Sequence, residues 1–358
     1  MVAVFHSIHL LPVDGISQVY LRTISDVHGA QATATRLLMI FFNGGAAVSL
    51  FFVMSGLVLA LSLQRDERPV PQLAPAFVLR RFFRIYPPLA FNVLAYAAAL
   101  WIVSSKWQSL YGDIPSVRAV RDNLILVDHE VNGATWSLAV ELLAVPFILL
   151  VHLLTRGRQP CLILIPAALA RIALFSPFLL FRVRYLYLFL FLFIWGMAIP
   201  RLAPSRMRRL SPRVTMVGFS TGALLLLGAR FVFGYWSRTS LGVEGVGATI
   251  LVSIVAYGPE IRPLRLLDGA VVRFLGRTSY SFYLYHPLFL SLEVPIVTAA
   301  LRATSLVAEY PLAIGLLIAV VTVFPAAVAG KLSFDWIEQP AVRLGRHLED
   351  LATRRWRS

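Results

Sequence analysis

Apolar stretches long enough to cross a lipid bilayer recur along the whole chain, separated by short charged or Pro/Gly-rich segments. A helix rises 1.5 Å per residue, so about 20 apolar residues cross a hydrocarbon layer of roughly 30 Å. Such runs lie at about residues 1–11, 37–63, 85–103, 136–154, 161–180, 185–199, 214–233, 246–258, 278–300 and 310–330. The pattern predicts an all-α, polytopic membrane helical bundle of about ten transmembrane helices.

Composition argues against a water-soluble globular protein, because 58% of the residues are hydrophobic and only 14% are charged, whereas a soluble domain is about one quarter charged. The net charge of +15 is spread between the apolar runs. We therefore expect the lipid bilayer, and no nucleic acid, as the partner of the basic residues. The lone Cys161 forms no intrachain disulfide, and the sequence contains no cluster of metal ligands, so we expect no metal.

The distribution of Lys and Arg predicts which loops face the cytoplasm. One alternate set of loops (64–84, 155–160, 200–213, 259–277 and 331–358) holds 22 of these residues, and the other set (12–36, 104–135, 181–184, 234–245 and 301–309) holds 9. Basic loops stay in the cytoplasm. We thus predict cytoplasmic termini, a membrane domain over 1–335 and a basic cytoplasmic tail over 336–358.

The first apolar run is short, since eleven helical residues reach about 16 Å, roughly half the hydrocarbon thickness. We therefore expect a first helix that is truncated in this sequence, with the natural start upstream of Met1. The first helix nevertheless carries an ionisable residue, His6.

Ionisable side chains inside hydrocarbon are costly, which makes them candidates for function. They are His6, Glu141, Arg171, Arg230, His286 and Glu293. In the predicted topology His6 and Glu141 share one level, about 7–8 Å below the outer boundary. A carboxylate that orients a histidine is a common support for a general base. The alternative is a hydrogen bond between helices without chemistry.

The ninth run brings several polar groups into the bundle through the segment SYSFYLYHP, residues 279–287. His286 and Glu293 are seven residues apart and share one helix face. Hydroxyls come from Ser279, Tyr280, Ser281 and Tyr283. The alternative for the individual tyrosines is anchoring at the membrane interface.

A basic cluster marks the cytoplasmic entrance of the third run, where Arg80, Arg81 and Arg84 lie within one helical turn of each other. Arginines in this arrangement bind phosphates, as a nucleotide-like donor such as coenzyme A requires. The alternative is a positive-inside anchor. In the second run, Ser55 and Gly56 permit close backbone approach, and Ser55 lacks the context of a nucleophile elbow.

Five ordered motifs together resemble the acyltransferase-3 family of integral membrane acyltransferases, which includes bacterial O-antigen and polysaccharide O-acetylases. The motifs are FFVMSG (51–56), RRFFRIYP (80–87), TWSLAVE (135–141), SYSFYLYHP (279–287) and IEQP (337–340). They span nearly the whole chain.

The resemblance implies a ten-helix bundle in a bacterial inner membrane. Such a bundle passes an acyl group, usually acetyl from acetyl-CoA, to a hydroxyl of a glycan or other cell-envelope acceptor at the outer face. Acyl-CoA is then a substrate, and no tightly bound cofactor is implied. The family's first-span histidine, regarded as its catalytic centre, corresponds to His6. Two departures are a basic residue that would lie before Met1, and Ser49 where many relatives carry Asp.

These observations lead to a hypothesis in which His6, oriented by Glu141, is the catalytic base and the three arginines bind the donor. His286 is expected to line the acyl tunnel or to relay the acyl group covalently. The tunnel or acceptor path is expected to include Ser55, Trp136, Ser279, Tyr280, Ser281, Tyr283 and Glu293. The rivals are a transporter or flippase, which the absence of an evident repeat of broken helices disfavours, and a non-catalytic truncated homologue.

Overall fold

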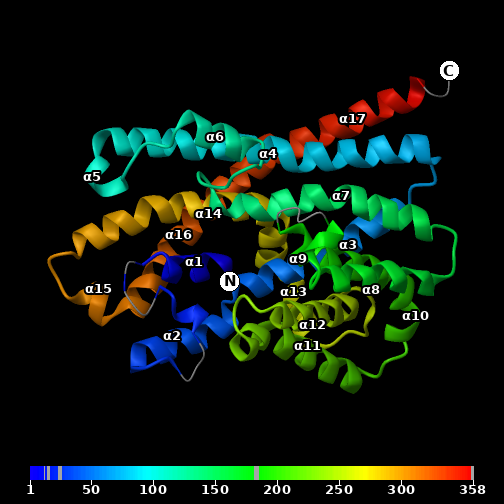
Figure 1. Ribbon diagram of the computed structural model, residues 1–358, viewed down its shortest axis with the longest axis horizontal. Coiled ribbons are helices and arrows are strands. Elements are labelled where there is room, and N and C mark those ends of the chain that lie inside the picture. The colour runs from blue at the N-terminus through cyan, green and yellow to red at the C-terminus, as the bar shows by residue number, and fades with distance from the viewer. Residues whose placement is uncertain (12, 14–16, 23–25, 181–184, 356–358) are drawn as a thin grey trace. The chain divides into compact units, whose positions relative to one another are not determined.

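The computed structural model describes residues 1–11, 13, 17–22, 26–180 and 185–355, and every regular element in those ranges is a helix (Figure 1). The expected outer loop 181–184, parts of the expected loop 12–36 and the last three residues of the expected tail lie outside the described residues. An all-helical chain is the expected result in lipid, because a helix satisfies its own backbone hydrogen bonds.

Six helical stretches are long and apolar enough to cross a membrane. They are Ala30–Gln64, Val70–Lys106, Gly133–Thr155, Pro212–Phe233, Arg238–Tyr257 and Pro311–Leu351. Two shorter apolar helices cover Pro160–Ala173 and Leu186–Leu202. The chain is therefore a multi-pass integral membrane protein, and each apolar run found in the sequence contains an α-helix.

Several helices begin earlier than the apolar runs indicated, and α4 and α12 are two of them. Helix α4 (Val70–Lys106) extends into the expected loop 64–84, because Leu73, Ala76 and Phe77 form a buried stripe at helical spacing. Helix α12 (Arg238–Tyr257) covers most of the expected loop 234–245. The side chain of Ser237 accepts a hydrogen bond from the Thr239 backbone and caps its start.

The helices form two compact units, and the division falls inside α4, α7 and α14. The first unit comprises Met1–Phe42, Val78–Ala139 and Arg273–Ser358. The second unit comprises Asn43–Phe77 and Val140–Val272.

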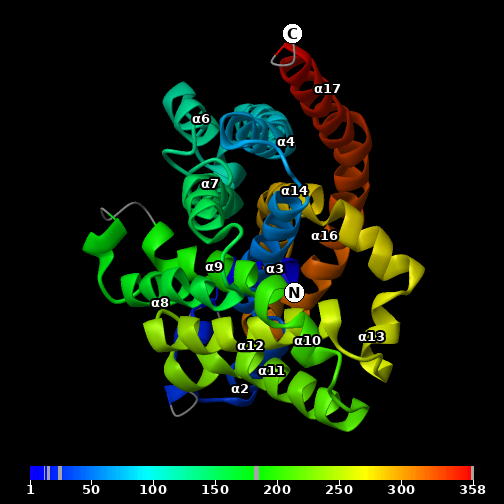
Figure 2. The same cartoon turned by 90° about the vertical axis from the view of Figure 1, so that its right-hand side faces the viewer.

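The first unit holds both ends of the chain. Its α-helices, whole or in part, are α1 (Val2–His9), α2 (Ala30–Phe41), α4, α5 (Gln108–Tyr111), α6 (Val117–Leu124), the start of α7 (Trp136–Thr155), α14 (Ala270–Ala300), α15 (Leu306–Glu309), α16 (Pro311–Ser333) and α17 (Gln339–Arg355). A π-helical turn, Phe334–Glu338, joins α16 to α17, and the two helices follow one another in Figure 2.

Helix α1 packs against α16 (Figure 1). The close approach requires glycine at position 315, because a Cβ atom there would lie 2.9 Å from the Ile8 side chain. A buried cluster from α14, α16 and the residues that follow α1 consists of Leu11, Leu290, Val294 and Ile318. Burial of this cluster fixes α1 beside α14.

The second unit contains the remaining helices. They are α3 (Gly44–Gln64), the main part of α7, α8 (Leu164–Ala173), α9 (Leu186–Leu202), α10 (Pro204–Met207), α11 (Pro212–Phe233), α12 and α13 (Arg262–Leu267). Helices α11 and α12 lie side by side (Figure 2). Where α3 crosses α9, Gly56 faces the Phe193 backbone and Gly196 faces the Val53 carbonyl, with no room for a Cβ atom on either. Small residues are the usual means of close helix packing in membranes.

A buried ion pair joins three helices of the second unit. The Arg230 guanidinium donates from Nε to Glu244 Oε1 at 2.6 Å and from NH2 to Oε2 at 3.1 Å. Ser49 on α3 donates to Glu244 Oε2 at 2.7 Å. The carboxylate partner of Arg230 therefore comes from α12, and Ser49 contributes a neutral donor.

Candidate active site

Two imidazoles meet in the first unit, one from α1 and one from α14. His6 Nδ1 lies 3.0 Å from His286 Nε2, and the rings are nearly parallel, with centroids 5.2 Å apart and an interplanar angle of 14°. His286 has no exposed surface, whereas His6 is half-buried. Both residues were predicted from the sequence as site residues, and the structure brings them into direct contact.

The side chain of His286 is fixed on its far edge by its own helix. Its Nδ1 lies 2.8 Å from the backbone carbonyl of Tyr283, and its ring stacks on that of Phe282 at an angle of 13°. Both nitrogens of His286 are thus engaged, one with its own backbone and one with His6.

Segment 132–137 holds the Tyr283 turn of α14 in place. The Tyr283 hydroxyl donates to the Ala134 carbonyl at 3.1 Å and receives a hydrogen bond from Ser137 Oγ at 3.1 Å. The buried Asn132 amide donates to the Leu284 carbonyl at 3.0 Å. This polar network connects the TWSLAVE and SYSFYLYHP motifs, so the two motifs form one structural element around the imidazole pair.

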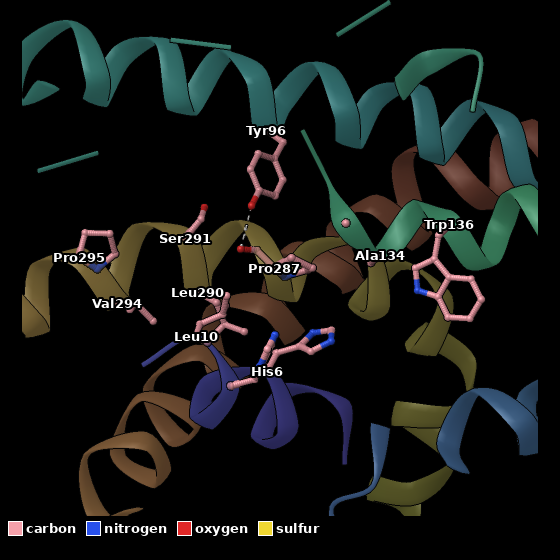
Figure 3. Close-up of a pocket in the computed structure, with 12 residues that line it drawn as sticks. His6, Leu10, Tyr96, Ala134, Trp136, Pro287, Leu290, Ser291, Val294 and Pro295 are labelled. Atoms are coloured by element: carbon pink, nitrogen blue, oxygen red, sulfur yellow. Dashed lines mark hydrogen bonds between the residues drawn. The ribbon is translucent and has the colours of Figure 1, made fainter. Parts of the chain in front are cut away.

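A cavity of about 440 Å³ opens beside His6 (Figure 3). Its lining is mainly apolar and consists of His6, His9, Leu10, Tyr96, Gly133, Ala134, Trp136, Pro287, Leu290, Ser291, Val294 and Pro295. Across the cavity, the Tyr96 hydroxyl donates to the Pro287 carbonyl at 3.2 Å. A mostly apolar pocket with a few convergent polar groups is typical of small-molecule sites. Trp136, expected on the acyl or acceptor path, lines this cavity.

A second cavity of about 690 Å³ shares Leu10, Val294 and Pro295 with the first. Its other lining residues come mainly from the segments that the charge count assigned to outer loops, including Ser109, Leu110, Arg302 and Thr304. The two cavities therefore adjoin, and together they extend from His6 to these loops.

His9 is a cavity residue that the sequence analysis did not single out. Its Nδ1 lies 2.9 Å from the Ser17 carbonyl, an arrangement in which Nδ1 carries the proton and Nε2 is a bare acceptor. The signal was present in the sequence, because residues three apart share a helix face and HSIH places His9 one turn after His6.

The three arginines of the RRFFRIYP motif lie in different environments. Arg80 forms an ion pair with Glu349 of α17, Arg81 is buried, and Arg84 is exposed. Arg84 exerts an electrostatic attraction on Glu338, whose carboxylate also accepts from Ser281 Oγ at 2.9 Å. Carboxylates of the C-terminal segment thus face the basic cluster.

The other expected lining residues lie outside the two cavities. Tyr280 donates to the Ile85 carbonyl at 2.7 Å, and Ser279 bonds to its own helix. Glu293 accepts from Thr322 of α16, so it is engaged away from His286 although the two share a helix face. Ser55, half-buried on α3, belongs to the second unit.

Glu141, expected to orient His6, is buried and lies in the part of α7 that belongs to the second unit. The hydrogen bond at His6 Nδ1 is made by His286. Within the first unit, the imidazole of His286 therefore orients His6.

The fold and these residues define a polytopic helical membrane protein with a histidine pair beside a mainly apolar cavity. The profile of the acyltransferase domain family, acyltransferase 3, matches residues 1–330. The chain belongs to this family and is a membrane acyltransferase. We found no match for it among curated proteins or among solved structures.

Proposed function

We propose that the protein transfers an acyl group, with acetyl as the first candidate, from acyl-CoA to a hydroxyl of a glycan or other cell-envelope acceptor. The observation that carries the proposal is His6, which bonds through Nδ1 to His286 and lines a cavity large enough for a small substrate. The second ring nitrogen of His6, Nε2, makes no hydrogen bond with any described residue.

His6 acts in this proposal as a general base. An alcohol is a weak nucleophile at neutral pH, and a positioned base typically contributes about 10²- to 10⁴-fold in rate. His6 Nε2 accepts the hydroxyl proton while the hydroxyl oxygen attacks the thioester carbonyl carbon. When the C–S bond breaks, the imidazolium returns that proton to the departing thiolate.

The transfer runs across an inner membrane of a bacterium in a topology of ten spans with both termini in the cytoplasm. Support comes from the excess of basic residues in one set of loops. It also comes from the adjoining cavities, which connect His6 to the opposite set. The acceptor hydroxyl enters along this route, and the thioester reaches His6 from the other side.

The donor's phosphates bind at Arg80 and Arg84 on the cytoplasmic side. Guanidinium groups are suited to phosphate recognition, and Arg84 is exposed. Arg80 becomes available when its ion pair with Glu349 opens. Acyl-CoA is a substrate in this scheme, and the reaction requires no bound cofactor.

Thiol release from acetyl-CoA by membranes containing the protein tests the proposal, with a cell-envelope glycan fraction as acceptor. We expect acceptor-dependent release by the wild type and a loss of about 10²-fold or more in His6→Ala. A matched control is His347→Ala, which removes an exposed imidazole of α17. Undiminished release by His6→Ala at equal membrane insertion would rule out His6 as the base.

A further inference from the structure

Pro287 follows His286 directly in α14, next to the imidazole pair. We infer that His286 is a positioning residue that fixes the tautomer of His6, and that its own tautomer is set by the Tyr283 carbonyl, which Pro287 releases from the helix. This inference rests on the proposed function, in which His6 is the base. It assigns His286 a role different from that of an acyl carrier.

The first step concerns the backbone of α14. In an α-helix the N–H of residue 287 would donate to the carbonyl of residue 283. Pro287 has no N–H, so the Tyr283 carbonyl lacks its helical partner. A buried carbonyl requires another donor, and His286 Nδ1 lies 2.8 Å from it. His286 therefore carries its proton on Nδ1.

The second step follows from the chemistry of neutral imidazole, in which one nitrogen donates and the other accepts. With its proton on Nδ1, His286 presents a bare Nε2 to His6, whose Nδ1 is 3.0 Å away. His6 must donate from Nδ1, which leaves His6 Nε2 without a proton. That is the state required of a base.

The alternative arrangement requires His286 to carry protons on both nitrogens. His286 has no exposed surface, and the Tyr283 carbonyl and the imidazole of His6, which contact its two nitrogens, are both uncharged groups. A buried cation without a carboxylate partner is costly. The arrangement in which both imidazoles are neutral and each carries its proton on Nδ1 is therefore favoured.

The geometry also opposes a covalent relay through His286. Its Nε2, the nitrogen that would attack a thioester, faces His6, and the stacked rings leave no space for an acyl group between them. His286 is fully buried and is not part of the cavity lining. Tyr283 and Pro287, on either side of it, are held by Ala134 and Tyr96.

Two variants of His286 separate positioning from relay. His286→Ala removes the acceptor for His6 Nδ1, so that His6 loses both its fixed ring position and its fixed tautomer. We expect kcat to fall by about 10²-fold or more, mainly through the lost ring position, with little change in KM for acyl-CoA. His286→Gln supplies an amide oxygen as the acceptor and is expected to stay within about 10-fold of the wild type. A relay needs the imidazole nitrogen itself, so both variants would then be equally inactive.

A third variant, Pro287→Ala, tests whether Pro287 determines which nitrogen of each imidazole carries the proton. The substitution restores a backbone N–H at position 287, which would compete for the Tyr283 carbonyl. We therefore expect a loss of kcat smaller than in His286→Ala, and a shift in the pH dependence of kcat. The matched control is Pro325→Ala, which replaces an interior proline of α16.

Nitrogen-15 NMR of labelled histidine in purified protein reads the tautomer without any reaction. We expect a protonated Nδ1 and a bare Nε2 at His6 in the wild type, and a mixture of tautomers in His286→Ala. A protonated Nε2 at His6 in the wild type, or equal inactivity of folded His286→Ala and His286→Gln, would overturn the inference. Absence of thiol release by the wild type, with the expected tautomer observed, would instead count against the proposed function.

Discussion

A single imidazole, His9, gives the cavity beside His6 a second basic nitrogen. The two side chains are one helical turn apart and line the same space, and each uses Nδ1 for a hydrogen bond within the protein. A substrate that carries neighbouring hydroxyls, as a glycan does, can then donate one hydroxyl to each ring. In the proposed reaction His6 accepts the reacting proton, and we propose that His9 holds the acceptor in place.

Replacing His9 should therefore affect binding more than turnover. For His9→Ala we expect the KM for the acceptor to rise about 3- to 10-fold, because one hydrogen bond contributes about 0.5–1.5 kcal/mol. The KM for acyl-CoA should stay unchanged. Initial-rate kinetics with each substrate varied would measure this, with His28→Ala, at an exposed position, as the control. A fall in kcat equal to that of His6→Ala would contradict the assignment.

Helices α3 and α9 of the second unit make a contact that leaves no space for a larger side chain at two glycines. Gly56 and Gly196 allow α3 and α9 to touch backbone to backbone, whereas Gly228 on α11 faces open space. Overpacking a close contact typically costs about 1–3 kcal/mol. We expect Gly56→Val to lower the Tm of the purified protein by several degrees, and Gly228→Val to have little effect. Equal Tm values for the two variants would contradict this packing.

The ion pair between α11 and α12 is a second feature on which the packing of the second unit depends. Arg230 and Glu244 are almost completely buried, with side-chain exposures of 6% and 0%. Leaving one partner of a buried pair uncompensated typically costs about 3–5 kcal/mol. Arg230→Ala should therefore greatly reduce the folded fraction recovered from membranes. The exposed pair Arg265–Glu260 provides the control, since Arg265→Ala should cost at most about 1 kcal/mol.

Helix α17 contributes Glu349 to the basic cluster of α4, where it pairs with Arg80. If Arg80 binds donor phosphate, Glu349 competes for the same guanidinium group. Glu349→Gln should then lower the KM for acyl-CoA a few-fold, and Arg80→Gln should raise it. Kinetics at fixed acceptor would detect both changes. A higher KM in Glu349→Gln would indicate that the pair holds α17 in a productive position.

At the scale of the whole molecule, the sequence was most informative about the elements and the family. The length of the apolar runs located the helices. Unpaired backbone polar groups are costly in lipid, so there are few alternatives to a helix. The sequence indicated His6 as an ionisable residue of the first apolar run and His286 as part of the SYSFYLYHP motif, each separately. Contact between them depends on how α1 packs against α14 and α16, which periodicity alone does not specify.

Two features of the site could have been found in the sequence and were missed. His9 follows His6 by one turn, and Pro287 follows His286 directly, so that the Tyr283 carbonyl four residues earlier loses its helical donor. The partner of Arg80 could not have been found in this way, because Glu349 is distant in sequence. The role expected for Glu141 stays a prediction.

The most direct test of the central claim measures transfer of labelled acetyl groups across sealed proteoliposomes. Labelled acetyl-CoA is supplied on the face that carries the basic loops, and a glycan acceptor is supplied on the other face. We predict label in the acceptor with wild-type protein and almost none with His6→Ala at equal reconstitution. Equal labelling by the two proteins would contradict the account of His6 as the base.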